Sequence, residues 1–142
     1  MKDDEPQKTT GERDLQKLIR ELSPSLNPDL YVFCTVKDAL YEDIVQAHPI
    51  ATFIEEEGLT LVLKQHVADA QGLVYQSTFR CITLKVHSSL TAIGLTAVVA
   101  TALAKKGISA NMMAGYFHDH VFVPANQAML AMQQLESLSK EF

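Results

Sequence analysis

The polar residues with the most chemical potential lie between Arg80 and Pro124 of this 142-residue chain. A β-branched, apolar run that ends at Val86 is followed by Ser88 and Ser89, residue types that often begin helices. Main-chain N–H groups at a helix start have no partner inside the helix, so they can bind a small anion. The pattern predicts an anion-binding corner where a strand is followed by a helix.

Ile93, Gly94 and Leu95 continue this candidate ligand site into a helix expected at 92–106. Gly94 carries no side chain, so a ligand could approach its backbone closely. The alternative interpretation is that a serine caps the helix and that Gly94 lets the helix pack on the sheet. The ligand hypothesis requires amides that face a crevice, and hydrophobic side chains filling the corner would contradict it.

The strand after this helix carries Asn111, Met112 and Met113, and the expected fold places it beside the corner. Asn111 could offer its amide to a ligand, and methionine forms an adaptable apolar wall. The alternative is that Asn111 pairs with the backbone of an edge strand and that both methionines belong to the core.

His118, Asp119 and His120 suggest zinc binding, which needs three or four convergent ligands. We expect these residues in a tight polar turn, where their side chains diverge and Asp119 can form an Asx-turn. The sequence therefore predicts no metal site, and it contains no catalytic motif and no phosphate-binding loop that would indicate an enzyme or a cofactor.

The composition argues against some further classes of function. A net charge of −5 argues against nonspecific nucleic-acid binding, which needs a basic surface. Cys34 and Cys81 each lie in an apolar run and are expected to be buried free thiols. No apolar run approaches the roughly 18 residues of a membrane span, so we expect a soluble, cytoplasmic protein without membrane contact.

The elements that would position the candidate residues form two similar halves, which indicates a duplicated ferredoxin-like α+β fold with antiparallel sheets and helices on one face. The expected order is close to βαββαβ twice, with the second half lacking its closing strand. We expect a mobile tail at 1–11, one half at 12–76 and the other at 77–142. The expected elements are helices at 12–22, 66–72, 92–106 and 125–138, strands at 30–36 and 75–86, and hairpins at 50–63 and 107–123.

Three segments of the second half resemble an ACT domain: Ile93-Gly94-Leu95-Thr96, the run from Ala102 to Ser109, and the run from Tyr116 to Pro124. The resemblance covers roughly 80–138 and is closest to the subtype found in aspartate kinases and cytosolic arginine sensors. Many ACT domains place proline where this chain has Ile93.

The whole chain also resembles a bacterial family of short, two-part ACT-like proteins that are mainly uncharacterised. The runs that carry this resemblance in the first half are Tyr31-Val-Phe-Cys-Thr-Val36, Thr52-Phe53 and Glu56-Glu57-Gly58-Leu59-Thr60-Leu61.

The resemblance implies regulatory binding of a small molecule, most simply an amino acid, at a domain or subunit interface. Asp119 would then meet the ammonium group of the ligand. Edge strands would favour a homodimer or tetramer, and the chain would signal to a separate protein partner. The alternatives are a ligand-free structural or protein-interaction module and a small enzyme on a ferredoxin-like sheet. The predicted ligand-binding residues are Ser88, Ser89, Ile93, Gly94, Leu95, Asn111, Met112 and Asp119.

Overall fold

The computed structural model describes residues 11–38 and 41–141, so the expected tail lies outside the described residues except for Gly11. The chain packs as two compact units, one made of residues 28–80 and the other of residues 11–27 together with 81–141. The N-terminal segment therefore packs with the C-terminal part of the chain. The domain boundary between residues 76 and 77 stays a prediction.

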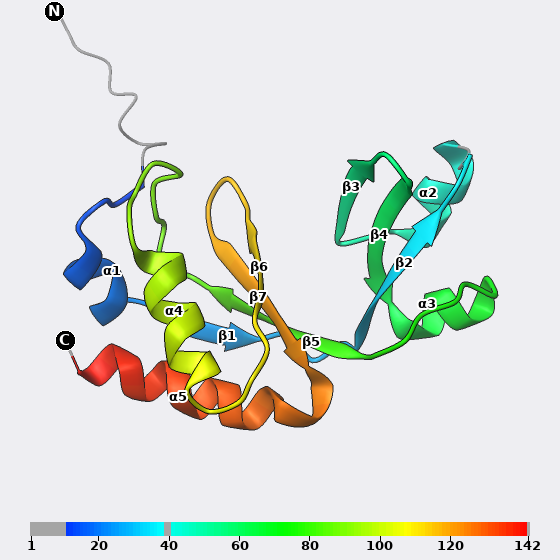
Figure 1. Cartoon of the computed structure of the whole chain (residues 1–142). Coiled ribbons are helices and arrows are strands. Elements are labelled where there is room, and N and C mark those ends of the chain that lie inside the picture. Colours follow the sequence, from blue (N-terminus) through cyan, green and yellow to red (C-terminus); the bar gives the residue numbers. More distant parts are fainter. Residues whose placement is uncertain (1–10, 39–40, 142) are drawn as a thin grey trace, which may run out of the picture. The chain divides into compact units, whose positions relative to one another are not determined.

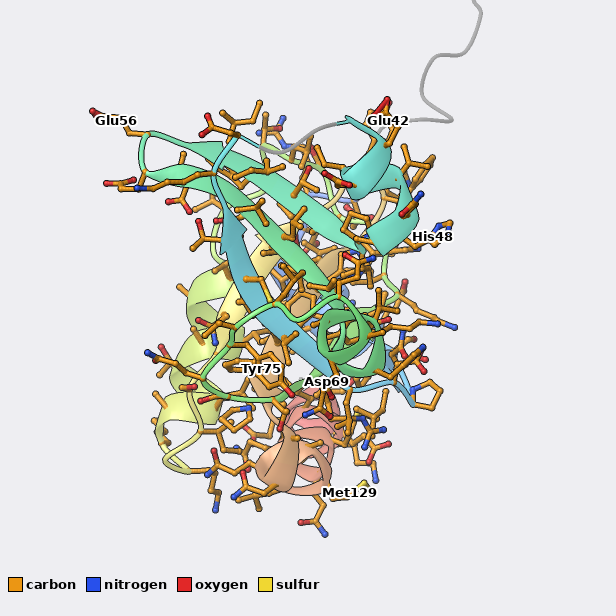
Figure 2. The ribbon with its side chains drawn as sticks, turned by 90° about the vertical axis from the view of Figure 1, so that its right-hand side faces the viewer. Glu42, His48, Glu56, Asp69, Tyr75 and Met129 are labelled. Atoms are coloured by element: carbon orange, nitrogen blue, oxygen red, sulfur yellow. The ribbon has the colours of Figure 1, made fainter. Side chains whose placement is uncertain are left out.

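The unit of residues 28–80 follows the order βαββαβ, with the first two residues of β5 as its last strand (Figure 1). Strand β2 pairs antiparallel with β4, β4 pairs antiparallel with β3, and Tyr31 of β2 pairs with Phe79 at the start of β5. The turn between β3 and β4 lies at residues 56–57, because Glu55 pairs with Gly58. Figure 2 shows Glu56 at the tip of this hairpin. The elements are β2 (Tyr31–Val36), α2 (Tyr41–Ala47), β3 (Ala51–Glu55), β4 (Gly58–Lys64), α3 (Gln65–Ala70) and the start of β5 (Phe79–Leu84).

The core of this unit follows from the alternation of its strands. Successive strand residues point to opposite faces, so Val32 and Cys34 share one face with their cross-strand partners Leu63 and Leu61. All four are buried, and they pack with Ala47 and Ala68 of the two helices. Beyond α3, the Tyr75 hydroxyl donates to Asp69 at 2.7 Å, which ties the helix to the loop that follows it (Figure 2).

The second unit has the strand order β1-β5-β7-β6. Its closing strand is β1, which precedes the other strands in the chain and pairs antiparallel with β5 from Pro24↔Leu84 to Leu26↔Ile82. The expectation that this half lacks a closing strand is therefore wrong, because the segment after the first helix supplies it. The elements are α1 (Leu15–Arg20), β1 (Pro24–Leu26), β5, α4 (Leu95–Ala104), β6 (Asn111–Ala114), β7 (Asp119–Pro124), the 3-10 turn η2 (Ala125–Gln127) and α5 (Ala128–Lys140).

Three helices cover one face of this second sheet. Ile82 and Leu84 of β5 and Val121 and Val123 of β7 are completely buried on that face. The helical residues buried with them are Leu18 and Ile19 from α1, Leu95, Val99, Ala102 and Leu103 from α4, and Ala128, Ala131, Leu135 and Leu138 from α5. The predicted α+β fold of two ferredoxin-like units is confirmed.

Within the described residues, no helix combines the length and the apolar character that crossing a membrane requires.

Candidate functional site

The strand-to-helix corner of the second unit is a long loop, residues 85–94, and not a tight junction. Helix α4 begins only at Leu95, with Gly94 as its N-cap residue and no side-chain capping hydrogen bond. The prediction that Ser88 or Ser89 caps this helix is wrong. The chain turns into the helix through the φ of +104° at Gly94, a conformation that L-residues rarely adopt.

Ser88 joins the loop to the β6–β7 hairpin. It is buried, and its hydroxyl donates to Oδ2 of Asp119 at 3.5 Å. The prediction that Asp119 lies in the turn is wrong. Asp119 begins β7, on the same strand face as the buried Val121. The corner therefore holds a carboxylate on the side of the sheet that the helices cover.

Desolvation raises the pKa of the Asp119 carboxyl above its usual value, although the Ser88 hydroxyl and the charges of His120 and His118 act in the opposite direction. A half-buried carboxylate of this kind gains from a cationic partner, because an opposite charge favours its ionised form.

The two histidines of the hairpin have different hydrogen-bond partners. His118 Nδ1 lies 3.4 Å from the carbonyl oxygen of Val86, and His120 Nδ1 lies 2.9 Å from Oγ1 of Thr83. Desolvation, with the charge of His118, keeps the pKa of His120 below its usual value. Over residues 11–38 and 41–141, no three His, Cys, Asp or Glu side chains are grouped as a metal site requires.

The other loop residues contribute mainly backbone. The Ser89 hydroxyl accepts the Thr91 N–H at 3.2 Å and lies 3.0 Å from the Thr91 hydroxyl. The Ile93 side chain is 83% exposed, whereas Leu95 is buried in the core. Leu95 can therefore offer a ligand only its amide, at the positive end of the α4 dipole.

Asn111 and Met112 lie away from the corner, at the beginning of β6. Asn111 pairs with Phe122 and its amide donates to the Phe122 carbonyl at 3.3 Å. Ala114, not Asn111, is the β6 residue opposite Asp119, which puts Asn111 about 10 Å further along the strand. Met112 packs against the core. Participation of either residue in ligand binding stays a prediction.

An unexpected partner of the corner is the segment that precedes α1. The Glu12 N–H donates to the His87 carbonyl at 2.7 Å, and the Ser89 N–H donates to the Glu12 carbonyl at 2.9 Å. These two bonds form a parallel bridge between Glu12 and Ser88. No residue type in the sequence indicates this bridge, since it uses only main-chain atoms.

Leu15 covers a second part of the same corner. A Cβ on Gly94 would lie 2.9 Å from Cδ2 of Leu15, so the leucine side chain occupies the approach that the glycine was expected to leave open. The Ser89 amide is paired and the backbone of Gly94 is covered, so the expectation of bare amides at this corner holds for neither residue.

Comparisons with known proteins identify the fold family. Two family models, both described as ACT domain, match the sequence over residues 10–80 and 76–137, and the first range alone is half of the chain. The chain belongs to the ACT domain family. ACT domains are regulatory and not catalytic modules, which supports a small-molecule-binding regulatory role in general terms.

Solved structures show the same fold. A Vibrio cholerae protein described as of unknown function and a possible transport protein is 50% identical, with a TM-score of 0.81 over 88% of this chain and 95% of its own. The ligand-free regulatory subunit of aspartate kinase from Thermus thermophilus is 11% identical, with a TM-score of 0.61 over 83% of this chain and 97% of its own. Escherichia coli aspartokinase III with aspartate and ADP is 12% identical, with a TM-score of 0.61 over 81% of this chain and 32% of its own. No curated protein matches the sequence.

Proposed function

We propose that this ACT protein binds a free amino acid at the corner formed by residues 85–95 and the start of β7, and that it acts as a regulatory module. One observation carries the proposal: the Asp119 carboxylate accepts a hydrogen bond from the buried Ser88, which lies in the loop that leads into α4. An amino acid carries both complementary charges. Its ammonium would meet Asp119, and its carboxylate would meet the amides at the positive end of α4.

The related structures support the ligand class and the regulatory role. One relative is described as a regulatory subunit of aspartate kinase, and another is a complex with aspartate. At 11% and 12% identity these relatives share the fold, so the residues that bind the ligand must be found in this chain itself.

The ligand would act by binding one arrangement of the protein better than another. An affinity ratio of that kind is typically worth ~1–3 kcal/mol in allosteric coupling. Because the family module is regulatory, the altered arrangement would be read by a separate protein partner, in a cytoplasmic setting.

A homodimer or tetramer fits the free sheet edges. Among the described residues, β3 pairs only with β4, and β6 pairs only with β7. On β3, the side chains of Phe53 and Ile54 are 67% and 85% exposed. An exposed, apolar edge strand can pair with the same strand of a second copy.

A thermal-shift screen against the twenty amino acids tests the proposal. We expect one amino acid, or a chemically related few, to raise the melting temperature at millimolar concentration. The shift should be lost in Asp119→Asn and retained in Asp69→Asn, which makes the same chemical change in the other unit. A screen in which no amino acid raises the melting temperature contradicts the proposed function.

One observation favours the rival class, a structural or protein-interaction module without a ligand. Leu15 covers Gly94 and the Glu12 carbonyl already binds the Ser89 amide. In such a module the corner would be filled permanently, and Asp119→Asn would change stability alone.

A further inference from the structure

The segment Gly11–Leu15, here called the N-terminal strap, lies against the corner. Its backbone hydrogen-bonds to the corner through one N–H and one carbonyl, both from Glu12. Glu12 presents its N–H to the His87 carbonyl at 2.7 Å and its carbonyl to the Ser89 N–H at 2.9 Å. A free amino acid carries a nitrogen and a carboxyl group on one Cα in the same order. Its ammonium could donate to the His87 carbonyl and its carboxylate could accept the Ser89 N–H. An ammonium has three N–H donors and a carboxylate two oxygens, so these contacts add to those proposed above with Asp119 and the amides of α4.

Only the main chain of Glu12 is used in these contacts. The Glu12 carboxylate turns back onto its own segment, where it accepts the N–H groups of Arg13 at 2.9 Å and Asp14 at 3.0 Å and pairs with Lys17 at 3.1 Å. No described side-chain contact of Glu12 reaches the loop of residues 85–94.

The strap is also shaped for close contact. A Cβ on Gly11 would overlap the backbone of Ser88 and Ser89, so glycine alone allows the strap to lie this close. At the other end of the strap, Leu15 packs on Gly94. Gly11 and Leu15 thus hold the strap on both sides of the Glu12 bridge.

The strap can leave without unfolding of the unit, because the next residues hold the chain independently. Leu18, Ile19 and Leu22 have no exposed surface and belong to the core. Against the loop of residues 85–94, the strap is held by two backbone hydrogen bonds and by the partly buried Leu15. Segments with few buried contacts open at the lowest free energies in native proteins.

We propose that the N-terminal strap is an internal substitute for the ligand, which closes the corner of the free protein and is displaced when a free amino acid binds. This gating rests on the proposed function. It accounts for the covered corner. The exposed, charged Asp14 within the strap and Lys17 just after it keep this segment in contact with solvent. If only a small fraction of the protein has an open corner that can bind the ligand, the observed affinity is the intrinsic affinity multiplied by that fraction.

Isothermal titration of the full-length protein with each of the twenty amino acids tests the gating. Gly11→Val forces the strap away from Ser88, and Glu12→Pro removes the N–H that His87 accepts. Gln16→Val, on the exposed side of α1, is the matched control. We expect about 10-fold tighter binding or more in Gly11→Val and Glu12→Pro, and wild-type affinity in the control. Circular dichroism melting confirms that each variant is folded.

Hydrogen exchange on the wild-type protein gives a second readout that needs no variant. The Glu12 amide should be protected in the free protein and should lose its protection when the amino acid found by titration is added. Equal affinity in wild type and both strap variants, or a Glu12 amide that stays protected with ligand bound, overturns the gating and leaves the proposed function intact. Binding of no amino acid to any variant overturns the proposed function and the gating with it.

Discussion

Leu15 and Gly94 are in direct contact across the corner of the second unit: a Cβ at position 94 would lie 2.9 Å from Cδ2 of Leu15. This contact joins the segment before α1 to the residue that begins α4. The neighbour is the far end of a flexible side chain and can shift, whereas the φ of +104° at Gly94 cannot be relieved in this way. The main reason why position 94 requires glycine is therefore its backbone conformation.

Gly94→Ala should lower the free energy of unfolding by ~1–3 kcal/mol, the usual range for an L-residue in a sparsely populated backbone conformation. Urea denaturation measures it. Adding Leu15→Ala to Gly94→Ala should relieve only the steric part of the loss, so the two changes should be less than additive. A Gly94→Ala protein as stable as wild type would show that the backbone at residue 94 adopts another conformation.

Asp119→Asn should make stability less dependent on pH in mild acid. Burial raises the folded-state pKa of Asp119, so the folded state holds this proton more tightly than the unfolded state. The contribution to stability is full below the unfolded pKa and is lost as pH rises through the folded one.

The variant keeps the acceptor for Ser88 without the buried charge. At neutral pH it should be as stable as wild type or more stable, and this advantage should disappear in acid below the unfolded pKa. Glu136→Gln, at an exposed position of α5, is the control. An advantage of Asp119→Asn that grows in acid would contradict the desolvation of this carboxylate.

Glu12 should show the opposite dependence on pH. Hydrogen bonds from the Asp14 backbone, the Lys17 side chain and the Arg13 backbone lower the pKa of Glu12 to about 2. A depressed pKa stabilises the folded state above the unfolded value of 4.5, and this stabilisation is lost as pH falls towards about 2.

The stability difference between wild type and Glu12→Gln should thus be present at neutral pH and absent near pH 2. It should also be reduced in high salt, since these groups are exposed and screened by ions. A difference that persists at pH 2 would assign the effect to something other than the charge.

Ser139→Ala should weaken the packing of α5 on α1. The Ser139 hydroxyl lies 3.0 Å from the carbonyl oxygens of both Ile19 and Arg20, in the last turn of α1. Loss of this donor should lower the free energy of unfolding by ~0.5–1.5 kcal/mol. Ser137→Ala, exposed on the same helix, should have little effect. Equal losses in the two variants would remove the interhelical bond as the cause.

The sequence predicted the elements better than their ends. The spacing of Leu15, Leu18, Ile19 and Leu22 identified the buried face of α1, because side chains three and four residues apart share a helix face. It did not identify β1, whose three residues include Pro24 and are too few for a visible alternation. That strand is recognised only when its pairing with β5 is known.

The sequence singles out some residues of the candidate corner and misses others, and the site itself stays a prediction. Ser88 and Asp119 are polar side chains beside apolar strands, so their residue types stand out, and the structure brings them together. Asn111 also stands out, but the register of β6 places it opposite Phe122. The Glu12 bridge depends on main-chain atoms that every residue has, so no residue type marks it.

The central claim, that the corner of the second unit binds a free amino acid, is tested most directly by nuclear magnetic resonance of the ¹⁵N-labelled protein titrated with each of the twenty amino acids. The account predicts saturable shifts for one of them, or for a related few, at the amides of Ser88, Ser89, Leu95 and Asp119, with smaller changes along α5. Shifts confined to residues 28–80, or no saturable shift with any amino acid, would contradict it.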